Sequence, residues 1–354
     1  MVVLIDVCHT PQFNFYKPLV KRLSDSGDTI LLTVMNRGRL LKIANHEVGD
    51  WPGVEVVKMG NHRLNRLSVI FESNFLRIFQ MLFWGFNKHI DIVYGNGFIP
   101  HILGWLKRIP RYAFDDDPDT IDFTPKKWFC TESNYCLWKE PEKLKNSPSN
   151  VKVLKSLKEW AYLSPSVFKP NAGVLKTYNV EPKEYIFVRE VTVGTINYVG
   201  QQADSILQIS DKFPKGMKVL LSLEKKDKKD QYPKDWILLQ EPLEDVHSLI
   251  YYSAGLVSSG DSMAREAALL GVPSYYLGIR FDMPANEAAN EVADLQNQKT
   301  MPVDEWLDRL AKNHDAAERQ IQMRKYINET FTDVNDYMFK LILKEKNKER
   351  KQVI

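Results

Sequence analysis

The amino-acid sequence predicts an α/β protein with two domains, each built on a doubly wound parallel sheet. Short, continuously apolar runs recur along the chain, and segments with helical spacing lie between them. Continuously apolar strands are typical of parallel sheets that are covered on both faces. The chain has 354 residues, more than one hydrophobic core usually serves, so we expect two domains of roughly 150–180 residues.

The apolar runs are the candidates for strands. The first half of the chain contributes Val2–Ile5, Thr29–Val34, Val54–Val57, Asp91–Tyr94 and Tyr112–Phe114. The second half contributes Tyr185–Val188, Lys218–Leu223, Trp236–Gln240, Gly255–Ser258 and Ser274–Leu277. Between them, apolar residues at helical spacing run from Phe15 to Leu23, and Gly27 follows as a C-cap. Strands that alternate with helices indicate right-handed βαβ units.

The alternation breaks between Phe129 and Pro182, where proline, asparagine and lysine accumulate and strand signals are weak. We therefore expect an N-terminal Rossmann-like domain with its linker at 1–180 and a C-terminal Rossmann-like domain at 181–332. Residues 333–354 are expected to form an amphipathic helix with a basic tail. Two such domains would face a central cleft at the carboxyl ends of their strands, where open α/β sheets bind ligands.

The distribution of charge argues against a nucleic-acid partner. The chain has 48 basic and 45 acidic residues, and the segment 344–351 holds five basic and two acidic ones, which leaves 43 of each in the body. A neutral body lacks the basic face that phosphate backbones require. The basic tail is a candidate for peripheral contact with an anionic membrane, and a solvated helix end is the alternative.

Cysteine usage and the N-terminus predict a cytoplasmic protein. Cys8, Cys130 and Cys136 are too few for a disulfide framework and lack paired metal-ligand spacing. The N-terminus has no basic region followed by a long apolar run, so we expect no signal peptide. The aromatic stretch Phe71–Phe86 is too apolar for an ordinary surface helix. Core packing is the expected explanation, with a shallow membrane contact as the alternative.

The segment Gly255–Pro273 is the most informative for function. An apolar strand ends in the small polar residues 258–262, and a helix then runs to Gly271. Small residues at a helix start let backbone N–H groups approach an anion, and the helix dipole favours negative charge there. Glu266 lies about one turn into the helix, where its carboxylate could accept hydrogen bonds from ribose hydroxyls. The structural alternative makes Ser262 an ordinary N-cap and Arg265 and Glu266 a solvated pair.

This segment resembles the nucleotide-sugar motif of GT-B-fold proteins, in which a glycine/serine loop precedes E-A-x-x-x-G-x-P. More closely, the chain is similar to an uncharacterised archaeal and bacterial family related to GT-B glycosyltransferases and UDP-GlcNAc 2-epimerase. The matching segments are HTPQFNFYKPLVKRLSDSGDTILLT (9–33), LKEWAYLSP (157–165), YIFVRE (185–190), and EDVHSLIYYSAGL with SMAREAALLGVP (244–273). SMAREAALLGVP is the most specific of them. The family has no settled activity, so the resemblance implies the fold more firmly than the reaction.

The resemblance implies specific roles in the second domain. Ser259, Gly260, Asp261 and Ser262 would form the diphosphate loop, and Glu266 would bind the ribose. His247 would lie near the base, although a histidine on the first turn of a helix is otherwise unremarkable. Asp261 departs from the family pattern, because a carboxylate beside a diphosphate is repulsive unless it turns away or a cation intervenes.

Arg189 ends the first strand of the second domain. Its guanidinium offers a fork to phosphate oxygens, so it is a candidate partner for the leaving diphosphate. The alternative is an interdomain ion pair with one of the acids that follow Phe114.

Candidate residues of the first domain follow its strands. His9 could act as a general base, since imidazole titrates near neutral pH; helix capping or packing on Pro11 is the alternative. In the acidic run 115–119, Asp115 and Asp117 would point the same way if the strand continued, as a catalytic acid or base or as metal ligands. A plain turn is the alternative. Gly95, Asn96 and Gly97 form a turn that would line the cleft.

Taken together, the residues and the resemblance predict a GT-B-like glycosyltransferase. It would move a sugar from a nucleotide-sugar donor to a glycan or lipid-linked acceptor without a cofactor, and a divalent metal could take part but is not required. A non-hydrolysing 2-epimerase is one alternative, although the 94–98 turn lacks the aspartate that such epimerases place there. A non-catalytic nucleotide-sugar-binding protein of polysaccharide assembly is the other, and Asp261 favours it.

Overall fold

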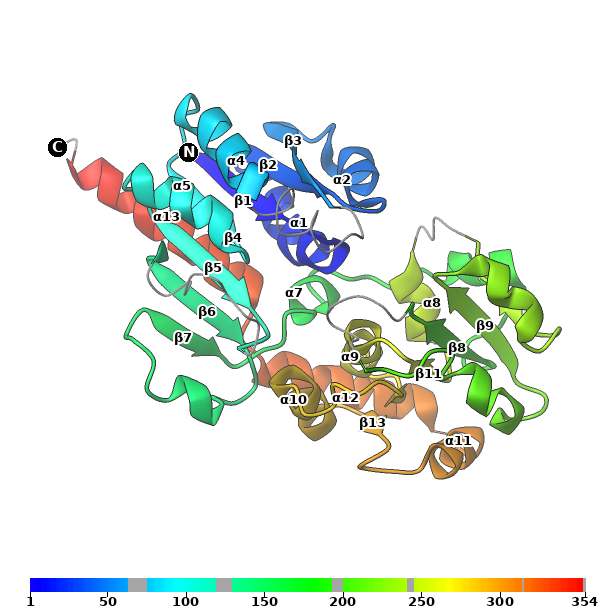
Figure 1. Ribbon diagram of the computed structural model, residues 1–354. Coiled ribbons are helices and arrows are strands. Elements are labelled where there is room, and N and C mark those ends of the chain that lie inside the picture. Colours follow the sequence, from blue (N-terminus) through cyan, green and yellow to red (C-terminus); the bar gives the residue numbers. More distant parts are fainter. Residues whose placement is uncertain (63–74, 119–128, 193–199, 241–244, 314, 353–354) are drawn as a thin grey trace. The chain divides into compact units, whose positions relative to one another are not determined.

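The computed structural model describes residues 1–62, 75–118, 129–192, 200–240, 245–313 and 315–352 (Figure 1). The chain divides into two compact units. Unit 1 comprises Met1–Tyr162 and Thr332–Ile354, and unit 2 comprises Leu163–Phe331. Each unit is a layered α/β structure with its own sheet and core, and each is described here by itself.

The described part of unit 1 contains a seven-stranded sheet in the order β3-β2-β1-β4-β5-β6-β7. Every strand pair in it is parallel. The strands are β1 Val2–Val7, β2 Thr29–Asn36, β3 Val54–Asn61, β4 Ile92–Gly95, β5 Arg111–Asp115, β6 Glu132–Cys136 and β7 Val151–Leu154. The helices are α1 Thr10–Asp25, α2 Leu40–Val48, α4 Arg77–Phe86, α5 Phe98–Leu106, α7 Trp160–Leu163 and α13 Val334–Gln352, with a short 3₁₀ turn η2 at Glu142–Leu144.

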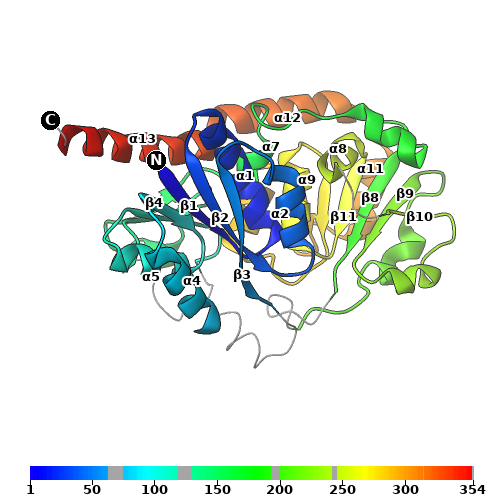
Figure 2. The same ribbon diagram turned by 90° about the horizontal axis from the view of Figure 1, so that it is seen from above.

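Alternate residues of β1 show how helices cover both faces of this sheet. Val3 and Ile5 pack with α1 and α13, whereas Leu4 packs with α4 and α5. Figure 2 shows the same division, with α1 and α13 on one side of the sheet and α4 and α5 on the other. Because β1 is buried on both faces, its run Val2–Ile5 is continuously apolar.

Unit 2 contains, within the described residues, a six-stranded sheet in the order β10-β9-β8-β11-β12-β13, also parallel throughout. The strands are β8 Tyr185–Glu190, β9 Lys218–Leu223, β10 Ile237–Leu238, β11 Gly255–Ser258, β12 Ser274–Tyr276 and β13 Leu295–Asn297. The helices are α8 Val246–Tyr252, α9 Asp261–Leu269, α10 Pro284–Val292, α11 Val303–Ala311 and α12 Ala316–Thr330, with 3₁₀ segments η3 Ala172–Tyr178, η5 Leu207–Lys212 and η6 Lys226–Gln231. Two parallel-sheet α/β units confirm the predicted fold class.

The division between the units differs from the one expected at residue 180. Residues 163–180 belong to unit 2 because they pack on its helix α8. The backbone N–H of Asn171 donates to Ser248 Oγ at 2.9 Å, and the Phe168 ring contacts Tyr251 edge-on with centroids 6.2 Å apart.

The C-terminal helix α13 returns to unit 1 instead of forming a segment apart. Met338 and Ile342 are buried in its core, and the Tyr94 hydroxyl donates to the Met338 carbonyl at 2.9 Å. Lys346, in the basic tail, binds Asp28 Oδ2 at 2.6 Å. Part of the tail's charge is therefore used within the fold.

Helix α4 carries the described part of the aromatic stretch; residues 71–74 lie outside the described ranges. Arg77, Met81 and Gly85 are buried, as core packing requires. The opposite side of the helix does not pack in the core, because Phe79 and Phe83 are exposed. No helix among the described residues is both long enough and apolar enough to cross a bilayer.

Candidate functional site

The start of helix α9 lies at the carboxyl edge of the unit 2 sheet, where the sequence places the phosphate loop. Strand β11 runs beside β8, with Ser258 opposite Arg189. After β11 the chain turns tightly, because Ser258 Oγ accepts from the Gly260 N–H at 3.0 Å and donates to the Gly260 carbonyl at 2.7 Å. Gly260 then occupies the N-cap of α9. Ser262, the expected N-cap in the structural alternative, lies inside the helix.

Ser259 anchors this loop to strand β8. Its Oγ accepts from the Val191 N–H at 2.9 Å, and its N–H donates to the Arg189 carbonyl at 3.0 Å. On the other side Gln201 Nε2 donates to the Ser259 carbonyl at 2.8 Å. The loop is therefore held by hydrogen bonds from two separate segments.

Asp261, the predicted source of repulsion in the loop, is paired with two cations. Its carboxylate Oδ2 lies 3.0 Å from Arg280 Nη1 and 3.5 Å from Arg265 Nη1, and the residue is 4% exposed. The two guanidinium groups offset the negative charge of this carboxylate. The helix dipole at the start of α9 favours an anion. The charge of Asp261 is therefore offset by neighbouring arginines.

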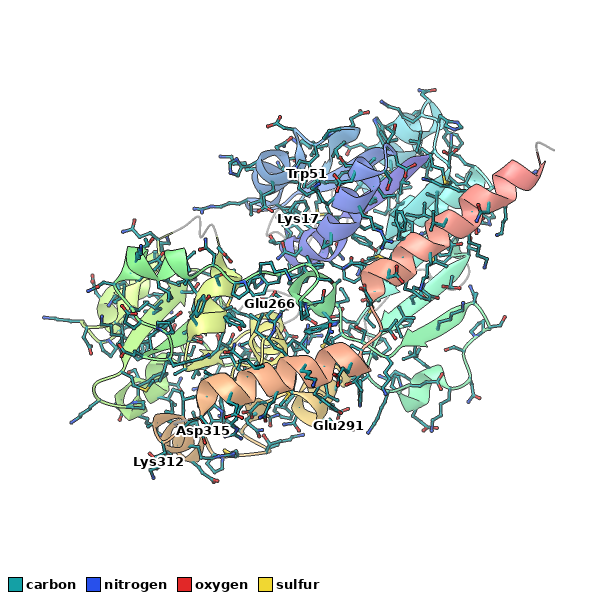
Figure 3. All side chains as sticks on the ribbon, turned by 180° about the vertical axis from the view of Figure 1, so that it is seen from behind. Lys17, Trp51, Glu266, Glu291, Lys312 and Asp315 are labelled. Atoms are coloured by element: carbon teal, nitrogen blue, oxygen red, sulfur yellow. The ribbon has the colours of Figure 1, made fainter. Side chains whose placement is uncertain are left out.

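Arg265 and Glu266 do not form a solvated pair, because both side chains are buried. Arg265 Nη1 donates to Asn286 Oδ1 at 2.7 Å, on helix α10. Glu266 Oε2 lies 3.4 Å from His247 Nε2, which joins helices α9 and α8. Figure 3 shows Glu266 inside unit 2. The two residues predicted to meet the ribose and the base are therefore brought together.

Arg189 has an ion-pair partner within unit 2. Its Nη1 donates to Ser222 Oγ at 2.9 Å and its Nη2 lies 2.8 Å from Glu224 Oε1, both at the end of strand β9. The neighbouring Glu190 is buried, and that burial raises the pKa of its carboxyl group. Glu190 Oε2 accepts from the Ile206 N–H at 2.8 Å. This hydrogen bond connects the end of β8 to the segment before η5.

In unit 1, His9 stands at the N-cap of α1, although its side chain makes no capping hydrogen bond. Burial, together with the charges of Lys158 and Arg37, lowers the pKa of His9 to about 3. The imidazole is therefore neutral at physiological pH. A general base works best with a pKa near the operating pH, so the lowered pKa makes this imidazole a weak proton acceptor at neutral pH.

The acidic run after β5 forms a turn, and the strand ends at Asp115. Asp115 Oδ1 accepts from the N–H groups of Asp116 at 2.8 Å and Asp117 at 3.4 Å. Asp115 and Asp117 thus do not continue a strand with their side chains on one side, which corrects that expectation. Asp116 pairs with the buried Lys158 at 2.9 Å, and Asp119 lies outside the described residues.

In the turn after β4, Gly95 is closely packed and Gly97 is not. A Cβ atom at Gly95 would lie 3.0 Å from Pro100 Cγ, whereas at Gly97 it would meet open space. Asn96 is buried, and its Oδ1 accepts from the Tyr16 hydroxyl at 3.2 Å. Gly97 is the N-cap of α5.

Three functional candidates could not be found from the sequence. Arg280 binds Asp261, which lies 19 residues earlier in the sequence. Asn286 accepts from Arg265, which lies 21 residues earlier. Lys158 lies inside the LKEWAYLSP match, which is a signal, but its pairing with Asp116 across 42 residues is decided by the fold.

Two further features bear on what the site can hold. Within the described ranges, no three His, Cys, Asp or Glu side chains gather as a metal-ligand group. A hollow of about 310 Å³ in unit 2 is lined by residues such as Trp306, Leu310 and Arg319. Pro273 and Asp294, which directly precede β12 and β13, also line it, so it lies at the amino ends of these strands. It is therefore distinct from the α9 site.

Comparison with known proteins defines the class of fold. No protein-family model matches the chain, and no curated protein matches it. Several solved structures match the chain in fold. The glycotransferase of kitacinnamycin aligns with a TM-score of 0.62 and 12% identity, over 97% of this chain and 98% of its own. UDP-GlcNAc 2-epimerase from Neisseria meningitidis, bound to UDP-GlcNAc, aligns with a TM-score of 0.65 and 14% identity, over 97% and 100%.

A third structure, the spinosyn rhamnosyltransferase complexed with thymidine diphosphate, aligns with a TM-score of 0.61 and 13% identity, over 96% of this chain and 99% of its own. The chain therefore has the fold that GT-B glycosyltransferases and UDP-GlcNAc 2-epimerases share. At these identities the likeness shows the fold alone.

Proposed function

We propose that this chain is a glycosyltransferase that moves a sugar from a nucleotide-sugar donor to a glycan or lipid-linked acceptor. One observation carries the proposal. At the carboxyl edge of the unit 2 sheet, the α9 start combines a small-residue turn, a carboxylate paired with Arg265 and Arg280, and the buried Glu266–His247 pair. A nucleotide diphosphate needs this combination of anion donors and a ribose acceptor.

In the proposed reaction, unit 2 binds the donor and unit 1 the acceptor. The acceptor hydroxyl attacks the anomeric carbon, and its proton passes to the neutral imidazole of His9. The bond between the anomeric carbon and the diphosphate oxygen breaks, and the nucleoside diphosphate leaves with its electron pair. The α9 N-terminus, with Arg189 and Arg280, stabilises the charge that develops on the leaving group.

The donor site is tested by ligand-induced thermal shifts. We expect one of UDP, GDP, dTDP, ADP and CMP, or its sugar conjugates, to stabilise the protein by about 2.7 kcal/mol at 100 times its Kd, a shift of roughly two degrees or more. Glu266→Ala should lose this shift because the ribose acceptor is gone. Glu305→Ala, an exposed acid on α11, is the matched control and should keep it. Absence of any shift with wild-type protein would contradict the proposal.

Product analysis then separates the possible reactions. Release of nucleoside diphosphate that depends on an acceptor is the expected result. An epimeric nucleotide sugar formed without acceptor would identify a 2-epimerase instead. Donor binding without product under any acceptor would identify a non-catalytic binding protein.

The pH dependence tests His9 as the base. Because the pKa of His9 is lowered to about 3, the imidazole stays deprotonated as the pH falls through 6.5. The acid limb of kcat/KM should therefore lie well below pH 6.5. Arg37→Met removes one of the cations that lower this pKa, so the limb should move to higher pH. Arg39→Met is the control, because it removes an exposed cation and should leave the acid limb unchanged. A limb near 6.5 in the wild type, or the same profile in His9→Asn, would exclude this role.

A further inference from the structure

The outer side of α4 and the end of α5 form an exposed apolar surface on unit 1, which we call the α4–α5 surface. Its exposed aromatic members on α4 follow helical spacing, so they line one side of the helix over about 10 Å. The exposed side chains are Phe75, Leu76, Phe79, Phe83, Phe86, Trp105 and Leu106. Figures 1 and 2 both show α4 and α5 side by side.

These rings do not pack in the core of unit 1. The residues on the inner side of α4 pack there instead. Met81 packs with Ile99 and Leu103 beneath the helix. A Cβ atom at Gly85 would lie 2.2 Å from Leu103 Cδ2, so the two helices approach as closely as a glycine allows. Phe83, on the outer side, is 75% exposed. Contiguous exposed apolar side chains of this kind mark an interaction surface.

The charges on these two segments are of one sign. Residues 75–88 and 98–108 contain no aspartate or glutamate, while they contain Arg77, Lys88, Lys107 and Arg108. Arg77 is used inside the fold, where it binds Asp6. The other three lie at the C-terminal ends of α4 and α5. Lys88 Nζ pairs with Glu55 Oε1 on β3 at 3.2 Å, so Lys107 and Arg108 give the apolar surface its basic end.

Two of these amines lie beside the rings of the surface. Lys107 Nζ donates to the Lys88 carbonyl at 3.0 Å and lies 5.9 Å from the Phe86 ring centroid. Lys88 Nζ lies 5.7 Å from the Trp84 ring centroid. A long side chain that covers apolar surface while its amine reaches the polar rim is the arrangement found at membrane interfaces.

We propose that the α4–α5 surface binds a bilayer that contains anionic lipids. Helix α4 would lie in the plane of the interface, with its phenylalanine rings among the acyl chains and the basic end at the headgroups. A second copy of the chain fits this surface less well. A two-fold contact would place Lys107 and Arg108 of the two copies against one another, with no acid on either segment to offset them.

This surface is separate from the basic tail. The tail continues helix α13, which packs on the other side of the unit 1 sheet with α1. The two candidate membrane contacts can therefore be changed independently. The inference does not depend on the proposed function, because vesicle binding is measured without donor or acceptor.

Co-sedimentation with vesicles tests the proposal. We expect the full chain to bind vesicles of phosphatidylcholine with phosphatidylglycerol and to bind pure phosphatidylcholine weakly, with binding that falls as salt rises. The double substitution Phe79→Ser/Phe83→Ser should weaken binding about tenfold or more. Ile321→Ser is the matched control, because Ile321 is an exposed apolar residue on α12 of unit 2 and its loss should leave binding unchanged.

Other results would overturn the proposal. Failure of the wild type to bind the anionic vesicles would exclude a membrane role, as would equal binding by the Phe79/Phe83 variant with an unchanged melting temperature. If Lys344→Glu in the tail abolished binding while the Phe79/Phe83 variant kept it, the tail would be the contact. A wild-type dimer that the Phe79/Phe83 substitution dissociates, without vesicle binding, would assign the surface to a second copy.

Discussion

Replacing Arg77 by methionine should destabilise unit 1 by about 3–5 kcal/mol, because it leaves a buried carboxylate without its cation. Arg77 Nη2 lies 2.5 Å from Asp6 Oδ1, and both side chains are almost completely buried. Arg77 Nε also donates to the Met59 carbonyl at 3.0 Å, which ties α4 to β3. Equilibrium urea unfolding, followed by far-UV circular dichroism, should show the loss as a lower transition midpoint.

Two further variants separate the buried charge from loss of packing. Asp6→Asn/Arg77→Met removes both charges while the amide oxygen can still accept from Thr33 Oγ1, which binds Asp6 Oδ1 at 2.7 Å in the wild type. This double variant should recover part of the lost stability. Lys21→Ala breaks the exposed Lys21–Asp25 pair and the contact of the amine with the Trp51 ring, and we expect a change below about 1 kcal/mol. If Arg77→Met and Lys21→Ala lowered the unfolding midpoint by the same small amount, the Arg77–Asp6 pair would not contribute to stability as proposed.

Replacing Arg280 by alanine should weaken nucleotide-sugar binding about tenfold to a hundredfold, on the proposed function. A hydrogen bond to a charged group contributes roughly 1.5–3 kcal/mol. Arg280 reaches the first turn of α9 from the loop after β12, and Asp261 holds its guanidinium there at 3.0 Å. The measurement is donor affinity by isothermal titration calorimetry.

Matched variants show whether this effect is specific to the site. Arg280→Lys keeps the charge without the planar fork, so we expect an intermediate loss. Arg309→Ala removes an exposed cation that lines the hollow at the other edge of unit 2, and the affinity should stay unchanged. An equal loss in Arg280→Ala and Arg309→Ala would indicate a general effect of net charge and would remove Arg280 from the site.

Most of the strands could be predicted because strands buried on two faces have continuously apolar sequences. β1, β8 and β11 are examples, each with a buried apolar run where the sequence places it. The strands β6, β7 and β13 were missed. β6 reads ESNYC, and its polar residues Ser133 and Asn134 are buried, so no hydrophobic pattern marks it. β7 lies at the edge of the sheet with one fully buried residue, Leu154.

The candidate site was predictable in its position and not in its pairings. The small residues after β11 and the helix that follows them are local features, so the sequence places the loop correctly. The cations that neutralise Asp261 are not local, because Arg280 arrives on a different loop. In the same way, the turn at Asp115 ended a strand that the sequence alone allowed to continue.

The sequence by itself determined the class of fold and the positions of most strands, and it placed the small-residue loop between β11 and α9. These features depend on burial patterns and helix signals that act over a few neighbouring residues. The tertiary structure alone decided which charges meet and which apolar side chains stay outside. Arg77 meets Asp6 across 71 residues, and Phe83 is left exposed. Such pairings depend on side chains that only the folded chain brings together.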